Sequence, residues 1–278
     1  MIFENFKNIP NNLDVANIGS GISYNDFVWD IDIDLKGHNF AICPEDFRYD
    51  ARIIKKYGKH LKSGAVVIIV VCPLSFGKNE YLYEDFFSEK YVDLLPKEDV
   101  DVSKLKYFLF SKIKSLYSFH VILRKIPIYI KAKIRRLFKM SSNESSVDII
   151  IKGWIHDSPG LSDLRNPNQA EKFVSVFEEK KADLRKVVDN CLVQNLVPVI
   201  LIPPISDSLY SRMSPEFLKA FMYDNISEEV ARGIKILDYL RDETFMVDSN
   251  YKNGLFLTEE KKVLFTKRVI SDIKESVL

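Results

Sequence analysis

The sequence is poor in the residues on which metal centres and disulfide frameworks depend. Its 278 residues include only three cysteines and four histidines. Cys43, Cys72 and Cys191 are odd in number, far apart and set in apolar runs, so we expect buried free thiols in a reducing compartment. No spacing of histidine, cysteine and acid predicts a zinc site, and no metal is expected.

Other absences exclude further classes of protein. Glycine is scarce, at ten residues, and neither a Walker motif nor a dinucleotide fingerprint occurs, so no cofactor is predicted. No apolar run approaches the roughly 18 residues of a membrane span. The start, Met1–Phe6, lacks the basic residues and apolar core of a signal peptide. We therefore expect a cytoplasmic protein, or one that is peripheral to a membrane.

The charge of the chain is balanced overall but unevenly distributed. The formal net charge is +1, which gives the whole molecule no general attraction to nucleic acid. Between residues 101 and 140, however, eleven Lys or Arg stand against one acid, a local charge of +10, so the remainder sums to −9. The hydrophobic fraction of 46% is that of a soluble protein with a sizeable core.

The hydrophobic pattern alternates between strands and helices. Apolar runs predict strands at Leu13–Ile18, Ala65–Cys72 and Val197–Ile202. Helical spacing of apolar residues predicts a long helix over Gln169–Asn195 and a closing helix from Thr258. Because strands alternate with helices, we predict an α/β fold with three layers and a doubly wound parallel sheet.

The alternation stops in the middle of the chain. Residues 73–146 are aromatic-rich at first and basic later, and they predict a helical insertion. The α/β core is accordingly expected over residues 1–72 and 147–278.

Shorter segments give four finer expectations. His38–Cys43 and Val147–Ile151 are expected strands, and Asp30–Leu35 is either an edge strand or an extended loop. A helix is expected to begin at Glu45-Asp46 and to end at Ser63-Gly64, with apolar residues along one face as far as Leu61.

Two short blocks carry a resemblance to a known family. Asn17-Ile18-Gly19-Ser20-Gly21, after the first strand, resembles the first block of SGNH (GDSL-type) hydrolases in the variant that reads Gly-Ser-Ser. Phe256-Leu257-Thr258, before the last helix, is similar to the closing Asp-x-x-His-Leu-Asn/Thr block. The resemblance implies an enzyme fold that cleaves or transfers acyl esters, many of them on carbohydrates. In that family a serine attacks the carbonyl, a histidine takes its proton, and an aspartate orients the histidine.

The residues at the chemical positions of that pattern are different here. The nucleophile's position holds Gly21, while Ser20 matches the middle residue of the block. Phe256 replaces the histidine and Asn253 the aspartate. The resemblance implies a ligand cleft formed by Asn17, Gly19, Gly21, Asn39, Asn253 and Phe256.

Neither a shifted alignment nor a third block restores the pattern. Moving the closing block upstream recovers an acid at Asp248, but Tyr251 then stands where the histidine should be. The family's Gly-x-Asn-Asp block is not evident after the central strand, where Cys72-Pro73 stands. The resemblance therefore implies a hydrolase fold that has lost its chemistry.

Catalysis by Ser20 stays open if the turn is shifted by one residue and a base arrives from elsewhere. His156, beside a Pro-Gly turn, is a candidate base, whereas His38 is better explained as a hydrogen-bonded structural residue. His60 is expected in solvent, and His120 is expected to pack on an apolar stripe.

The basic insertion allows several partners. Lys and Arg beside an apolar stripe over 101–140 suit an anionic membrane surface or a phosphate-bearing ligand, and less well a nucleic acid. The structural alternative is a helical subdomain whose charges are solvated.

Three functions are therefore carried forward. The first is a degenerate SGNH-like protein of surface-polysaccharide modification that binds a carbohydrate or acyl ester without cleaving it. The second is an active ester hydrolase or O-acyltransferase built around Ser20, and the third is a membrane- or partner-binding protein that uses the insertion.

Overall fold

The computed structural model describes residues 4–77, 88–112 and 145–277. The chain divides into two compact units, which are residues 1–80 with 146–278 (the sheet unit) and residues 81–145 (the inserted unit). Most of the basic stretch predicted between 101 and 140 lies outside the described residues. Among the helices that are described, none is both long and apolar enough to cross a bilayer.

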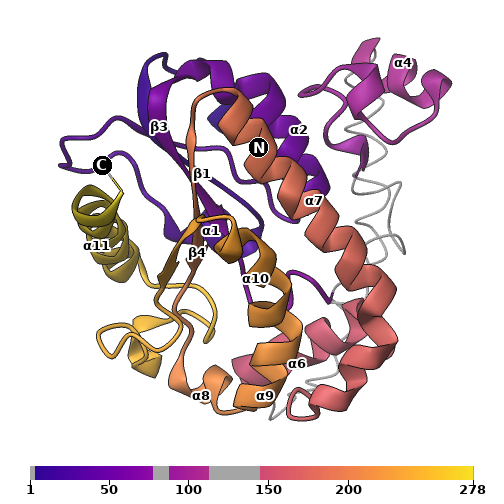
Figure 1. The fold of residues 1–278 in the computed structure, drawn as a ribbon, viewed down its shortest axis with the longest axis vertical. Coiled ribbons are helices and arrows are strands. Elements are labelled where there is room, and N and C mark those ends of the chain that lie inside the picture. Colours follow the sequence, from indigo (N-terminus) through magenta and orange to yellow (C-terminus); the bar gives the residue numbers. More distant parts are fainter. Residues whose placement is uncertain (1–3, 78–87, 113–144, 278) are drawn as a thin grey trace, which may run out of the picture. The chain divides into compact units, whose positions relative to one another are not determined.

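The sheet unit is built on five parallel strands in the order β2-β1-β3-β4-β5 (Figure 1). This arrangement confirms the α/β class and the parallel sheet expected from the sequence. The strands are β1 (Leu13–Ile18), β2 (Gly37–Asn39), β3 (Leu61–Val70), β4 (Val197–Ile202) and β5 (Lys235–Asp238).

The β-branched run in β3 explains why this strand lies at the centre of the sheet. Its residues from Val66 to Ile69 are fully buried, as expected for a strand covered on both faces. Val67 pairs with Ala16 of β1 on one side and with Pro198 of β4 on the other.

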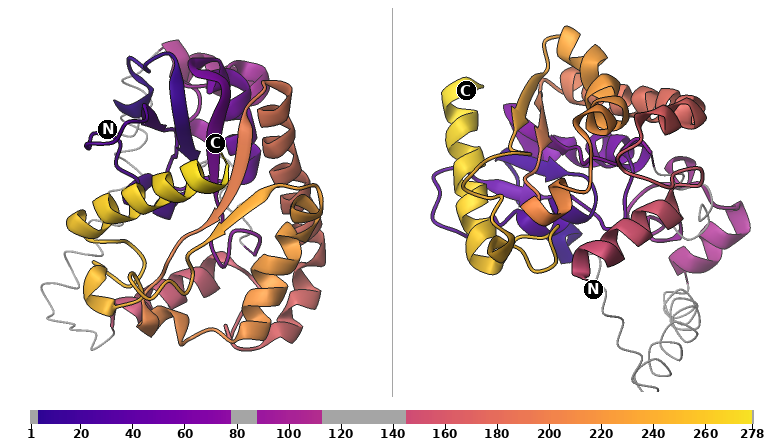
Figure 2. Two further views of the ribbon diagram at one scale, coloured as in Figure 1. Left: turned by 60° about the vertical axis from the view of Figure 1, so that its left-hand side comes forward. Right: turned by 90° about the horizontal axis from the view of Figure 1, so that it is seen from below.

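Helices cover both faces of this sheet (Figure 2). On one face, Phe265, Val269 and Ile273 of the closing helix pack into a cluster with strand residues that include Val66 and Ile68. On the other face α2 and α7 lie against each other. The helices of the sheet unit are α1 (Gly21–Asp26), α2 (Phe47–Tyr57), α6 (Ser146–Asp157), α7 (Val174–Val193), α8 (Asp207–Tyr210), α9 (Pro215–Leu218), α10 (Asp224–Ala231) and α11 (Glu259–Ser276).

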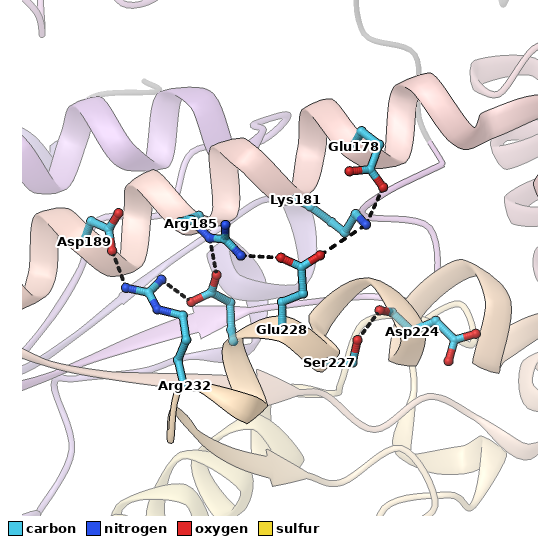
Figure 3. A network of polar contacts seen from close by, with 9 residues as sticks. Glu178, Lys181, Arg185, Asp189, Asp224, Ser227, Glu228 and Arg232 are labelled. Carbon is cyan, nitrogen blue, oxygen red and sulfur yellow. Dashed lines mark hydrogen bonds and ion pairs between the residues drawn. The ribbon is translucent and has the colours of Figure 1, made fainter.

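A chain of ion pairs joins α7 to α10 (Figure 3). The Glu229 carboxylate, which is almost completely buried, accepts from Arg185 at 3.2 Å and from Arg232 at 2.6 Å. Each guanidinium has a second acid, Glu228 for Arg185 and Asp189 for Arg232. Since acidic and basic side chains alternate in this series of ion pairs, the buried Glu229 carboxylate has a guanidinium group on each side.

The ends of the helices follow from the local sequence. Asp46 caps α2 by accepting a hydrogen bond from the Tyr49 N–H at 3.1 Å. Asn195 adopts a φ of 55° directly after α7, the left-handed conformation that asparagine tolerates at a helix end. Thr258 stands at the N-cap position of α11, although its side chain makes no capping hydrogen bond.

The expectation of a strand at Val147–Ile151 is wrong, because this segment lies in α6. A short apolar run fits a buried strand and a buried helix equally well. In the structure Val147 and Trp154 are buried, whereas Ile149 is 56% exposed, which is the one-sided burial of a helix.

The boundary between α2 and β3 also differs from the expectation. The helix ends at Tyr57, a 3-10 turn covers Gly58–His60, and Leu61 already pairs with Leu13 as the first residue of β3. An apolar residue at Leu61 fits both the helical and the strand period, so the pattern alone extended the helix.

Some short elements were overextended or missed. The strand expected at His38–Cys43 is observed as β2 over Gly37–Asn39, and of the two alternatives for Asp30–Leu35 the structure has the loop. Strand β5 and helix α1 were not expected, because each is too short to carry a hydrophobic period.

The described part of the inserted unit contains α4 (Lys104–Lys112) and a 3-10 turn at Lys97–Asp99. The Tyr107 hydroxyl donates to the Leu95 carbonyl at 3.0 Å, and Lys106 forms an ion pair with Glu89.

Candidate functional site

A pocket opens in the sheet unit at the carboxyl ends of β1 and β3. The chain leaves β1 toward β2 and returns to β3 on the other side of β1, so the direction of winding reverses between these two strands. Parallel α/β sheets bind ligands in the crevice at such a reversal. The cavity here measures about 200 Å³. It is lined by Gly19, Ser20, Gly21, Ile22, Cys43, Pro44, Glu45, Asp46, Phe47, Asp50, Val70, Cys72, Leu74, Ser75, Trp154, Leu255 and Phe256.

Asn17 and Asn39 hold the turn after β1 rather than line the pocket. The Asn17 amide is fully buried and donates to the Ser23 carbonyl at 3.0 Å and to the Asn39 side chain at 3.0 Å. Its oxygen accepts from the Trp29 indole N–H at 2.7 Å. Asn39 in turn donates to the Ser23 carbonyl at 3.3 Å. These buried polar groups are satisfied by one another, and they fix the path of the backbone into α1.

Ser20 lies in the pocket wall, but its hydroxyl already has a partner. Its Oγ accepts a hydrogen bond from the Glu45 N–H at 3.1 Å. The Glu45 carboxylate, 4% exposed, accepts from the Ile42 N–H at 2.9 Å. The serine therefore joins the turn after β1 to the loop before α2.

None of the described histidines lines this pocket. His38 is hydrogen-bonded to the Asn5 carbonyl at 2.7 Å, as expected for a structural histidine, and burial lowers the pKa of its ring. His60 is bonded to Asn11, and His156 is an exposed residue near the end of α6. His120 lies outside the described residues. No base for Ser20 is found among the histidines that the structure describes.

Gly21 and Phe256, far apart in the chain, meet in the pocket wall. A Cβ atom placed on Gly21 would lie 3.5 Å from Cε1 and Cζ of the Phe256 ring and 3.4 Å from Cys43 Sγ. These are ordinary van der Waals distances, so a side chain at position 21 would have room.

Asn253 shapes the turn that places Phe256. Its Oδ1 accepts from the Leu255 N–H at 3.1 Å and from the Phe256 N–H at 3.0 Å. Tyr251 and Leu257 close the turn through an antiparallel bridge. Asn253 itself is absent from the pocket lining, so the side chains that this turn gives to the pocket are those of Leu255 and Phe256.

The chemistry of the lining is aromatic and acidic. Phe47, Trp154 and Phe256 supply aromatic surface, and Glu45 and Asp50 supply carboxylates from the loop and first turns of α2. No lysine, arginine or histidine occurs among the described residues that line the cavity. Asp46, also in the lining, is paired with the buried Lys180 at 3.3 Å. Trp154 was not among the expected site residues, because the segment before it was expected to form a strand rather than the helix α6.

The acidic residues do not form a metal site. Among the described residues, no group of three or more His, Cys, Asp or Glu side chains is arranged to hold a metal ion.

The cysteines differ from the expectation of three buried thiols. Cys43 is exposed at the pocket, Cys72 is partly buried in its wall, and only Cys191 is buried. None of the three forms a disulfide. The expectation came from apolar neighbours in the sequence, but Cys43 follows a strand that ends early, at Asn39.

Comparison with known proteins assigns no family to this chain. A scan against protein-family models finds no match, and a search of curated proteins finds none either. The function is therefore argued from the residues and the geometry of the pocket.

Proposed function

We propose that this chain is a binding protein with an SGNH-like fold that has lost its catalytic groups, and that the pocket holds a carbohydrate or an acyl ester. The observation that carries the proposal is the position of the Phe256 ring, which would lie 3.5 Å from a Cβ atom at position 21. In the family pattern these positions belong to the nucleophilic serine and the histidine, which must lie within hydrogen-bond reach of each other. Two positions with that relation meet here, but they hold a glycine and a phenyl ring.

Binding without cleavage follows from the chemistry of these residues. Glycine has no nucleophile, and a phenyl ring cannot accept a proton. Ser20, whose hydroxyl lies in the pocket wall, accepts a hydrogen bond from the Glu45 N–H, and no described histidine lines the pocket.

The lining favours an uncharged ligand that is polar on one side and apolar on the other. Aromatic rings such as those of Trp154 and Phe256 bury the apolar face of a sugar or an acyl group. The wall also contains the acidic residues Glu45 and Asp50, 4% and 1% exposed, which disfavour phosphates and other anions. By resemblance, modification of surface polysaccharides is the setting that we propose.

The proposal is tested by rebuilding the missing groups. The variant Gly21→Ser/Asn253→Asp/Phe256→His has room at position 21, and aspartate keeps the oxygen that accepts from the Leu255 and Phe256 amides. We expect the wild type to resist a fluorophosphonate serine probe and the triple variant to be labelled at position 21, as mapped by mass spectrometry. The matched control is Gly21→Ser/Asn253→Asp, which lacks the base and should be labelled far more slowly.

Two outcomes would contradict the proposal. Labelling of the wild type at Ser20, lost in Ser20→Ala, would favour the active hydrolase or acyltransferase. A folded triple variant that stays unlabelled would show that the pocket does not have the geometry of a hydrolase.

A second candidate function is contact of the inserted unit with an anionic membrane. The observation that favours it is the exposure of Leu105 and Phe108, at 69% and 58%, three residues apart on α4 and beside Lys104 and Lys112. Apolar side chains next to lysines suit the surface of an anionic bilayer. We expect co-sedimentation with phosphatidylglycerol vesicles but not with phosphatidylcholine vesicles, and weaker binding of Leu105→Ser/Phe108→Ser. Equal binding to both vesicles would remove this candidate.

A further inference from the structure

A buried carboxyl group fastens the turn that carries Phe256. Asp26, at the end of α1, is 1% exposed. Its Oδ1 accepts a hydrogen bond from the Leu257 N–H at 3.1 Å. Its Oδ2 is buried and has no hydrogen-bond partner among the described residues. Within the described residues the Asp26 carboxyl therefore accepts a single hydrogen bond, which is costly if the buried group is charged.

A second unsatisfied polar atom lies in the same region. The Tyr251 hydroxyl is buried and also lacks a hydrogen-bond partner within the described part of the chain. Tyr251 stands at the base of the turn, where it bridges to Leu257. Burial, and then the charge of Asp26, raises the pKa of this phenol, so a charge on Asp26 is felt at Tyr251.

The turn between these anchors forms part of the pocket. Its backbone is closed by the Lys252 N–H, which donates to the Phe256 carbonyl at 2.8 Å. Its tip places Leu255 and Phe256 in the pocket wall, with the Phe256 ring against Gly21. Release of the Leu257 N–H would therefore loosen the wall that Phe256 forms.

We propose that Asp26 is a proton-operated latch, which holds the turn from Tyr251 to Leu257 closed when protonated and favours its opening when ionised. In the neutral form one oxygen accepts from the Leu257 N–H and the other carries the proton, so that no charge is buried in the closed turn. In the ionised form the carboxylate needs further donors, and the burial of Asp26 withholds them until the turn opens to water.

The charged groups around Asp26 agree with this assignment. Burial raises the pKa of the Asp26 carboxyl to about 7, against the opposing effects of the Leu257 N–H and of Lys252 and Lys262. Glu259 of α11 acts in the raising direction, and it is itself paired with both lysines. Asp26 in the closed turn therefore changes its protonation state near neutral pH.

The difference in the pKa of Asp26 between the closed and the open turn determines how opening depends on pH. The ordinary pKa of 3.8 applies to the carboxyl when the open turn exposes it to water, and the value of about 7 applies when the turn is closed. Between these two values the open form binds fewer protons than the closed form, so opening becomes about tenfold more favourable per pH unit. Above about pH 7 both forms are ionised, and the effect levels off.

The test is hydrogen exchange of the peptide that spans residues 250–258, measured by mass spectrometry from pH 5 to pH 9 and corrected for the intrinsic rate at each pH. For the wild type we expect protection to fall about tenfold per unit up to about pH 7 and then to stay constant. In Asp26→Asn the amide has an oxygen acceptor and an N–H donor at every pH, so the protection of residues 250–258 in this variant should not change with pH. Asp32→Asn, an exposed aspartate, is the matched control and should behave as the wild type.

Strand β4 serves as the internal reference in the same experiment. Flat protection of 250–258 in the wild type would overturn the latch, as would a pH dependence that persists in Asp26→Asn, since His38 and His60 titrate in both proteins. A parallel loss of protection in β4 would mean global rather than local opening, and it would overturn the latch too. The measurement needs no ligand, so its result is independent of the proposed function.

Discussion

Two glycines that flank Ser20 should respond in opposite directions to the same substitution. Gly19 has a φ of +119°, which L-residues rarely adopt, and a Cβ on it would lie 3.3 Å from the Val70 carbonyl and from Ser23 Cβ. Gly21 begins α1 without such a φ, and a Cβ on it would make ordinary contacts. The sequence presents them as an equivalent pair, but their backbones are different.

The expected magnitudes follow from these conformations. Gly19→Ala should lower the free energy of unfolding by about 1–3 kcal/mol, because alanine must adopt a strained φ in a tight space. Gly21→Ala should raise it by about 0.5 kcal/mol, because alanine loses less backbone entropy than glycine on folding. The two variants should therefore differ by at least about 1.5 kcal/mol.

Urea unfolding followed by circular dichroism measures this difference directly. Gly64→Ala is a useful control, since Gly64 has a φ of +81° but no atom within 4 Å of the added Cβ, and it reports strain without crowding. If Gly19→Ala leaves stability within about 0.5 kcal/mol of the wild type, or if both flanking variants destabilise equally, the described turn is wrong.

Two further predictions concern the rest of the sheet unit. Glu229→Gln should lower the free energy of unfolding by about 1–2 kcal/mol, because it removes the buried charge between Arg185 and Arg232, and no change would mean that the ion pairs of Figure 3 contribute little. With a thiol reagent such as DTNB, Cys43 should react in the native protein, whereas Cys191 should react only after unfolding, since burial raises the pKa of its thiol to about 12. Reaction of Cys191 at the rate of Cys43 would contradict the described core.

The long elements of the fold could be predicted from the sequence. The strands Leu13–Ile18 and Val197–Ile202 and the start of α11 were expected at their observed bounds, because each has a sustained apolar pattern and a clear end. The helix expected over Gln169–Asn195 is observed as α7, which begins only at Val174 because a 3-10 turn covers Pro167–Phe173. The turn signal after the first strand also placed Gly19–Gly21 at the carboxyl edge of the sheet, where the structure has a pocket, since carboxyl ends of parallel strands share one edge.

Short segments depended on tertiary contacts instead. Val147–Ile151 carries an apolar run that suits either a strand or a helix, and packing in the sheet unit made it the helix α6. Strand β5 forms because it pairs with the edge of β4. The local sequence of β5 does not indicate this partner.

The roles of the candidate site residues were decided in the same way. Asn17, Asn39 and Asn253 look like ligand-binding amides in the sequence, but each is occupied by backbone or side-chain hydrogen bonds that hold a turn. Gly21 and Phe256 lie near opposite ends of the chain, and only the folded sheet and α11 bring them into contact. Local composition determined the long elements of this protein, whereas hydrogen bonds and contacts between residues distant in the chain decided the short elements and which side chains face the pocket.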